Sequence, residues 1–376
     1  MIVVAALMIV LTALGGKKRS DFSIDIPTGA VVSVVEGGDG KPSVLSMTDS
    51  GGRATRHESL AEWRVKELDG SAGARRAFGS GTVSKFFNRD NLVSQTTYAS
   101  YIAVMAVGMT AIIILAGIDL SIGSIYALAA LLGAMALNWV GVQAGTAKML
   151  AVGLAVCCGA GAVMGFLNGF ASVALRVHPF VITLGAMTIY RGAVFVASDG
   201  QTIGVDSEAL QRRFFKADIA GVYPVPTLIM LLVALIGVFV LTRTVFGRRI
   251  YAIGGNETAA RYAGIPVGRV KVITYTILGA LAGLAGLMYL GYYGAAENNA
   301  GKGYELKVIA AAVIGGASLS GGKGSALGAV LGAIMVQLID NGLVILGIDQ
   351  SYNDIVMGAA IIAAVVVDQT KSNVMR

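Results

Sequence analysis

Long apolar runs, separated by short polar connections, are the feature that most limits how this chain can fold. The runs at 92–116, 225–241 and 272–290 contain no charged side chain. A helix needs about 20 such residues to cross the hydrocarbon core of a bilayer. Over the 376 residues, 14% are charged, against roughly 25% in soluble domains. The sequence therefore predicts an all-α membrane protein, a polytopic bundle of about ten transmembrane helices, several of them short or broken.

The first apolar run, residues 1–14, is too short for a full span. We interpret it as a first transmembrane helix whose start lies upstream of Met1. A cleaved signal peptide is the alternative, but the basic residues at 17–19 follow the run, whereas a signal peptide carries them before it. The other expected spans lie within 91–376, which we predict to be the transmembrane domain and which includes the loop at 243–271.

The stretch 15–90 departs from this pattern. It is polar and holds 12 of the 29 basic residues and 10 of the 22 acidic ones. Alternating apolar residues at 22–26 and 31–35 predict strands, 37–40 predicts a turn, and 59–68 fits a short helix or a strand. We interpret 15–90 as a small, β-rich insertion or a partly ordered loop, with a partner-binding module as the alternative. Helix parity predicts that it is periplasmic.

A basic loop at 243–271 joins two apolar runs. It contains six basic residues and one acidic residue, and short loops of this kind stay in the cytoplasm. An asparagine cap, a glutamate in the first turn and a glycine–proline stop predict a short helix over 256–266. Its small residues would let a cytoplasmic partner approach closely, although a solvated connector would look similar. The residues of this candidate coupling loop are Asn256, Glu257, Ala259, Ala260 and Gly264.

The glycines of the chain indicate how its helices pack. The chain has 51 glycines and six prolines, as expected for membrane helices that pack through small residues. Two sets of glycines recur at every fourth residue and are predicted helix-packing faces. They are Gly161, Gly165 and Gly169, and Gly324, Gly328 and Gly332.

The cysteines and histidines do not indicate a metal site or a disulfide. Cys157 and Cys158 are adjacent, so they point in different directions on a helix and are expected to be packing residues. His57 and His178 lie far apart, with no cysteine ligands nearby. The net charge of +7 is scattered over loops and the insertion, so nucleic acid is not an expected partner.

Polar side chains within or beside the apolar runs are candidates for a translocation path or gate. An ionisable group between apolar runs is costly unless it is paired or lies at a watery break. Asp119 is interpreted either as a cap for the helix that starts near 121–124 or as a gate residue. For the others, helix–helix hydrogen bonding is the alternative. The candidates are Asp119, Ser121, Asn168, Arg191, Asn298 and Glu305.

The segment 321–325 superficially resembles a phosphate-binding loop. It fails the pattern, because Ala317 stands where the first glycine is required and Gly324 follows Lys323 in place of serine or threonine. We therefore expect the chain to bind no cofactor and to hydrolyse no ATP. If the activity of the chain consumes energy, that energy must come from another subunit or from an ion gradient.

Five segments from residue 91 onward resemble, in order, the motifs of permease subunits of ribose-, xylose- and galactose-type ABC sugar importers, in the branched-chain amino acid permease-like superfamily. The loop at 257–264 is similar to the EAA-and-glycine loop by which such permeases dock on the ATPase, although Thr258 separates the glutamate from the alanines. The insertion departs from the family, which joins its first two spans briefly. The five segments are 117–124 (GIDLSIGS), 179–185 (PFVITLG), 251–257 (YAIGGNE), 303–306 (GYEL) and 315–322 (GGASLSGG).

This resemblance implies a multi-pass permease of the bacterial inner membrane that imports a monosaccharide and is not itself an enzyme. It implies a cytoplasmic ABC ATPase that uses the ATP, a periplasmic sugar-binding protein, and a second permease copy in a homo- or heterodimer, all in membrane lipid. The alternatives are an ABC permease for nucleosides, amino acids or a signalling sugar, a proton-coupled secondary transporter using Asp119, Glu305 or Asp340, and a sensor whose insertion binds an external partner.

Overall fold

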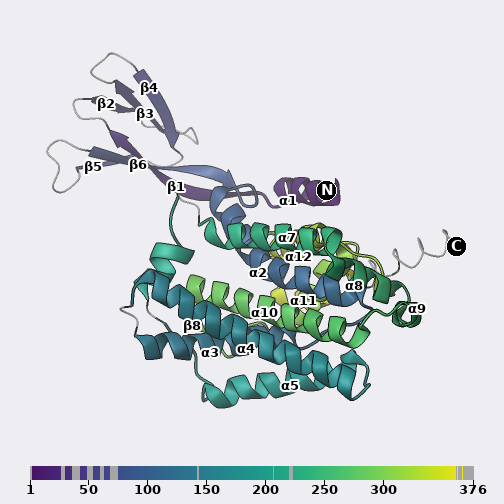
Figure 1. Cartoon of the computed structure of the whole chain (residues 1–376). Helices are drawn as coiled ribbons and strands as arrows, with labels where there is room; N and C mark the ends of the chain where they lie inside the picture. Colours follow the sequence, from purple (N-terminus) through teal and green to yellow (C-terminus); the bar gives the residue numbers. More distant parts are fainter. Residues whose placement is uncertain are drawn as a thin grey trace. The chain divides into compact units, whose positions relative to one another are not determined.

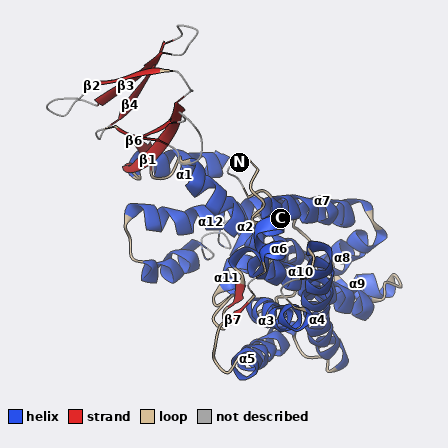
Figure 2. Ribbon diagram, turned by 90° about the vertical axis from the view of Figure 1, so that its left-hand side faces the viewer, coloured by secondary structure: helices blue, strands red, loops and turns tan. Residues whose placement is uncertain are grey.

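The computed structural model describes residues 2–26, 30–35, 43–48, 54–59, 63–67, 75–141, 144–205, 207–219, 223–360, 362 and 366. The chain divides into two compact units. One comprises Ala6–Leu92, and the other comprises Met1–Ala5 together with Val93–Arg376. The first contains most of the strands and the second most of the helices (Figure 2).

The larger unit is a bundle of helices (Figure 1). Within the described residues, seven helices are long and apolar enough to cross a membrane, which confirms a mostly helical, polytopic chain. They are α2 (Arg89–Ile114), α3 (Ile122–Val140), α4 (Thr146–Ala174), α5 (Pro179–Ala197), α7 (Val225–Arg243), α10 (Val267–Tyr293) and α12 (Ala326–Leu346).

The remaining apolar runs form shorter helices. They are α1 (Ile2–Leu14), with 13 residues, and α11 (Tyr304–Ile314), with 11 residues. Residues 353–360 are helical, and most of the expected last span beyond them lies outside the described residues. The count of about ten spans stays a prediction. The connections hold α6 (Glu208–Leu210), the π-helix η1 (Gln211–Phe215), the 3₁₀ helix η2 (Gln350–Tyr352), and the paired strands β7 (Ile203–Gly204) and β8 (Ala295–Ala296).

Local signals in the sequence explain where several helices begin and end. Pro179 is the first residue of α5, and the ring nitrogen Nδ1 of His178 accepts a hydrogen bond from the amide of Phe180. Gly294 and Gly347 end α10 and α12 in the left-handed conformation, which glycine adopts at little cost. The core is centred on α2, whose most apolar stretch is 89% buried, whereas that of α5 is 22% buried and lies at the periphery.

The most extensive helix contact joins α4 and α10, which run antiparallel. A Cβ atom added to Gly161 would lie 2.1 Å from the carbonyl oxygen of Gly279, and one added to Gly165 would lie 2.2 Å from that of Tyr275. Gly169 approaches the backbone of Val272 in the same way. No side chain fits between the two backbones, so this approach requires glycine at all three positions of α4.

The second glycine set is only partly as predicted. Gly328 and Gly332 lie on α12, where added Cβ atoms would lie 2.0 Å from the carbonyl oxygen of Gly315 and 1.9 Å from that of Ala311. The predicted third member, Gly324, is not on this helix, because α12 begins at Ala326 behind a Ser325 cap. The four-residue spacing of the glycines extends into the loop before α12, but the helix does not. The expectation that Gly324 lies on this helix was therefore wrong.

The described residues of the smaller unit form six strands in two antiparallel sheets of three (Figure 1). The sheet orders are β1-β6-β5 and β2-β3-β4. Leu45, Met47, Trp63 and Ala77 are buried between them, and the Trp63 indole nitrogen donates to the carbonyl of Ser43 at 3.2 Å. The strands are β1 (Lys17–Ile26), β2 (Val31–Val35), β3 (Ser43–Thr48), β4 (Ala54–Ser59), β5 (Arg64–Glu67) and β6 (Arg75–Ser84).

Two expectations for this unit can be compared with the strands. The segment 59–68, read as a helix or a strand, contains the end of β4 and the whole of β5. The turn expected at 37–40 lies outside the described residues.

Candidate functional site

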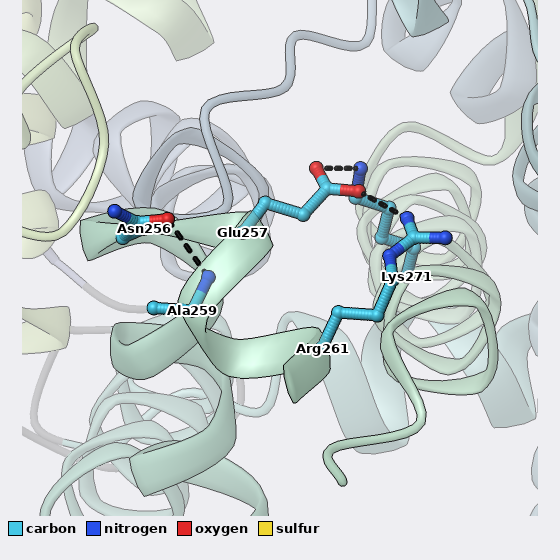
Figure 3. A network of polar contacts seen from close by, with 5 residues as sticks. All are labelled: Asn256, Glu257, Ala259, Arg261 and Lys271. Carbon is cyan, nitrogen blue, oxygen red and sulfur yellow. Dashed lines mark hydrogen bonds and ion pairs between the residues drawn. The ribbon is translucent and has the colours of Figure 1, made fainter. Parts of the chain in front are cut away.

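The basic loop folds into two helices. The first is α8 (Val245–Gly255), which the sequence reasoning missed, and the second is α9 (Glu257–Tyr262). Thr244 caps α8 by accepting from the amide of Gly247 at 3.1 Å. Asn256 caps α9 by accepting from the amide of Ala259 at 2.9 Å (Figure 3). The predicted cap and helix are confirmed. The signal for α8 was present in the threonine cap and in the spacing of Gly247, Ile250 and Ile253, which are buried.

Glu257 ties α9 to the start of α10. Its carboxylate accepts from Arg261 at 2.9 Å and from Lys271 at 2.7 Å (Figure 3). The hydrogen bond from Lys271 is the main cause that lowers the pKa of Glu257; partial burial raises it, and the charge of Lys271 and the bond from Arg261 lower it again. The carboxylate is therefore ionised at neutral pH. The pair with Arg261 lies within α9, and the pair with Lys271 holds α9 against α10, so the three side chains form a clamp.

The outer face of α9 is open. Ala259, Ala263 and Gly264 are exposed, and Tyr262 is 88% exposed. Gly264 has φ of 78° and ends the element as predicted. Ala260 is 5% exposed and points into the protein, so the expectation that it faces a partner was wrong.

The segment before α9 touches the end of α2 and the loop at 315–324. A Cβ added to Gly254 would lie 1.7 Å from the carbonyl oxygen of Ile114, at the end of α2. The same carbonyl accepts from the amide of Gly322, at 2.9 Å. The Tyr251 hydroxyl donates to the carbonyl of Gly324 at 2.7 Å. A displacement of α8 would therefore reach α2 and the 315–324 loop directly.

Asp119 lies in a buried polar cluster ahead of α3. Its carboxylate accepts from the amide of Ser121 at 2.8 Å and from the Ser121 hydroxyl at 2.6 Å. The Asn168 amide of α4 donates to the Ser121 hydroxyl at 2.7 Å and to the other Asp119 oxygen at 3.3 Å. The hydroxyl of Tyr190, on α5, donates to Asn168 at 3.2 Å. Asp119, Ser121 and Asn168 are at most 1% exposed.

This cluster brings together three residues predicted from the sequence and adds Tyr190, which was missed. Asp119 lies before the amino end of α3, as the capping interpretation expects, but it bonds the amide of Ser121, the residue that precedes the helix. The hydrogen bonds of the cluster connect the start of α3 to Asn168 on α4, and through Asn168 to Tyr190 on α5. Thr183, also on α5, accepts from the amide of Leu120 at 3.2 Å, so the turn is held from several sides.

A second polar cluster surrounds a cavity of about 440 Å³. Arg191 donates to the carbonyl of Ala300 at 2.8 Å and to that of Asn298 at 3.2 Å. Glu305 lines the same cavity. The side-chain amide of Asn298 instead donates to the carbonyl of Gly200 at 2.6 Å. Further lining residues that the site prediction did not include are Ser124, Thr188, Asn299 and Lys302.

The remaining membrane acid has a partner of its own. Asp340, on α12, forms an ion pair with Lys307 of α11, and both side chains are largely buried. An ion pair between neighbouring helices is an ordinary structural use of a buried carboxylate. Asp119, Glu305 and Asp340 thus lie in three different surroundings.

Comparison with known proteins gives consistent matches. A family model described as "Branched-chain amino acid transport system / permease component" matches residues 91–365. The ribose import permease protein RbsC of Escherichia coli (strain K12) is 40% identical over 288 residues, 76% of this chain and 88% of that protein. The D-allose transport system permease protein AlsC of the same strain is 40% identical over 293 residues, 78% of this chain and 87% of that protein.

A more distant relative is the autoinducer 2 import system permease protein LsrC of Photorhabdus luminescens. It is 32% identical over 284 residues, 76% of this chain and 83% of that protein. No solved structure matches the chain.

Proposed function

Because this chain belongs to the family of branched-chain amino acid transport system permease components, and within it to the ribose-, xylose- and galactose-type permeases, we propose that it carries a monosaccharide across the membrane for an ABC importer. It is a multi-pass transport subunit of the inner membrane, not an enzyme. A periplasmic binding protein delivers the sugar, and a cytoplasmic ATPase supplies the energy. The chain itself binds no cofactor.

The observation that carries this proposal is the capped, exposed helix α9 beside the membrane bundle. A short helix fixed by the Asn256 cap and the Glu257 clamp is a rigid element on which a partner can push. Its outer surface offers small residues and Tyr262, and exposed tyrosines are frequent anchors of protein interfaces. ATP binding closes the two ATPases, and α8 passes the displacement to α2 and to the 315–324 loop.

The wider architecture of the proposal follows from the same reasoning. The chain crosses the membrane about ten times, with α1, α11 and the helix from 353 as the short spans. The 243–271 loop faces the cytoplasm and the 15–90 insertion the periplasm. Two permease copies, identical or related, form the transport unit in the lipid bilayer. The largely exposed apolar surfaces of α4, α5 and α7 support burial against lipid or against the second copy.

For the solute path, we assign the cavity beside Arg191 and Glu305. Sugar hydroxyls are both donors and acceptors, and this cavity offers a carboxylate, an amide and cations around one space. Asp119, Ser121 and Asn168 are assigned to a gate, because their hydrogen bonds fix the turn between α2 and α3 against α4. Glu305→Ala should lower sugar import, while the exposed Glu208→Ala should not.

Ribose and allose, named for the two relatives at 40% identity, support a monosaccharide cargo. A second candidate is a signalling molecule of the autoinducer type, named for the relative at 32% identity. Direct binding by the partner periplasmic protein distinguishes the two.

The test is reconstitution in liposomes. With its ATPase, its binding protein, ATP and labelled ribose or allose, the chain should accumulate sugar, and a protonophore should not stop uptake. The chain alone, under a proton gradient, should accumulate none. Accumulation by the lone chain would contradict the ABC mechanism and favour proton coupling through Asp119, Glu305 or Asp340.

A further inference from the structure

A cleft opens where α4 ends, α5 begins and α9 meets the start of α10. One cavity of about 860 Å³ is lined by Arg176, His178 and Lys271 among others. A second, of about 630 Å³, is lined by Arg269 and Ile273. The two cavities share several lining residues, so they adjoin, and together they are called the cleft below. The shared residues are Val173, Arg261, Val267 and Gly268.

The cleft carries an excess of positive charge. Its only acidic lining residue among those described is Glu257, which is already paired with Arg261 and Lys271. Within the part of the chain that the structure describes, neither Arg176 nor Arg269 has an ion-pair partner. Two unneutralised guanidinium groups beside a hollow are suited to an anion, because arginine offers paired donors to phosphate oxygens.

The backbone at Arg176 is unusual. Its φ is 55°, in the left-handed region that costs a residue other than glycine or asparagine roughly 1–2 kcal/mol. The chain turns from α4 into α5 at this residue, where glycine would be free of strain. An arginine kept in such a conformation points to a use for its charge.

The other side of the cleft is apolar. Val173 belongs to α4, and Val272 and Ile273 belong to the first turns of α10. Ile273 is 48% exposed. Both helices are membrane-spanning, so the apolar wall continues toward the hydrocarbon core from a rim of cations. An amphiphile with a negative headgroup matches this arrangement, and basic pockets between helices at the cytoplasmic surface bind such headgroups.

We propose that this cleft binds an anionic phospholipid of the cytoplasmic leaflet. Arg176 and Arg269 hold its phosphate, and its acyl chains lie along Val173, Val272 and Ile273. The proposal rests on the proposed function for the orientation of the cleft. Since Arg261 of α9 lines the same cleft, the lipid contacts the element that receives the ATPase, and its headgroup charge adds to the clamp that holds α9.

The test uses the purified full-length chain, without ATPase, binding protein or sugar. Phosphatidylglycerol or phosphatidylcholine is titrated in, and bound lipid is counted by native mass spectrometry. We expect the chain to retain phosphatidylglycerol preferentially. Arg176→Gln and Arg269→Gln should each weaken its binding about fivefold, the effect of one cation near an anionic surface. Arg269→Lys, which keeps the charge, should retain most of the binding.

The matched control is Arg248→Gln with Arg249→Gln. These exposed arginines lie on α8, outside the cleft lining, so phosphatidylglycerol binding should be unchanged. Thermal melting of each variant checks that it is folded. Equal retention of the two lipids, or an equal loss in the α8 control, would show charge attraction without a site and would overturn the proposal.

Two other occupants are tested in the same assay. Inorganic phosphate at millimolar concentration should not displace the lipid, because it has no acyl chains for the apolar wall. Added ATPase should bind without releasing the lipid. Displacement by either would assign the cleft to a free anion or to protein docking, and it would refute a lipid site. Loss of sugar import in liposomes with lipid binding intact would refute the proposed function alone.

Discussion

At the scale of single residues, Asn256 is the residue on which α9 most depends. An N-terminal cap of this kind contributes about 1 kcal/mol to a helix. Because α9 has only six residues, the cap and the Glu257 clamp are the main interactions that hold it. We expect Asn256→Ala to reduce both sugar import and co-purification of the ATPase several-fold, with the chain still in the membrane. Asn256→Asp, which keeps the cap, should restore both.

The measurement is quantitative co-purification from the native membrane, with import assayed in parallel. If the alanine variant holds as much ATPase as the aspartate variant and the parent, α9 is not the docking element.

The ends of helices were predictable from the sequence, because they depend on the residues at the cap and stop positions. The cap at Asn256 and the stop at Gly264 follow from the rules for helix ends and were predicted. Ala260 was misplaced, because the side of a short helix that faces inward is set by the bundle beside it. Tyr190 was missed, since its bond to Asn168 joins two helices and leaves no pattern along the chain.

At the scale of helices, the seam between α4 and α10 depends on glycine. An added methyl group at Gly161 would meet the Gly279 carbonyl oxygen at 2.1 Å, whereas one at Gly159 of the same helix would have no atom within 4 Å. We therefore expect Gly161→Ala to destabilise the protein by about 1–3 kcal/mol, a typical cost of overpacking. Gly159→Ala should be neutral or slightly stabilising, because alanine favours helix.

Thermal unfolding of the two variants in the same detergent makes the comparison. Equal melting temperatures would mean that α4 and α10 separate without cost at this contact, in conflict with the packing described above.

Element boundaries were predictable to different degrees. The seven long membrane helices were predictable from the long apolar runs, because length and hydropathy alone identify a helix that can cross a membrane. The basic loop contained an unpredicted helix, α8, although its Thr244 cap and the helical spacing of its buried residues Gly247, Ile250 and Ile253 were visible in the sequence. Gly324 was assigned to α12 from spacing alone, and the Ser325 cap was the signal that excluded it.

At the scale of the whole molecule, the side of the membrane occupied by the insertion can be measured. In a variant with Cys157 and Cys158 changed to alanine, Thr55→Cys places a thiol on the exposed part of β4. It should react with an impermeant maleimide on intact spheroplasts. Ala263→Cys, on the exposed end of the coupling segment, should react only after lysis. The reverse pattern would invert the orientation proposed for the entire chain.

The register of the smaller unit has a consequence for how such a chain could have arisen. Lys17 pairs with Ser84 and Ile26 with Arg75, so the first and last strands run side by side over their full length. Directly opposed Cα atoms in an antiparallel pair are about 4.5–5.5 Å apart, little more than the 3.8 Å step between neighbouring residues. A short peptide could replace everything between Lys17 and Ser84 without moving the flanking backbone. The paired ends of the strands are therefore compatible with gain or loss of the module as a single piece of coding sequence.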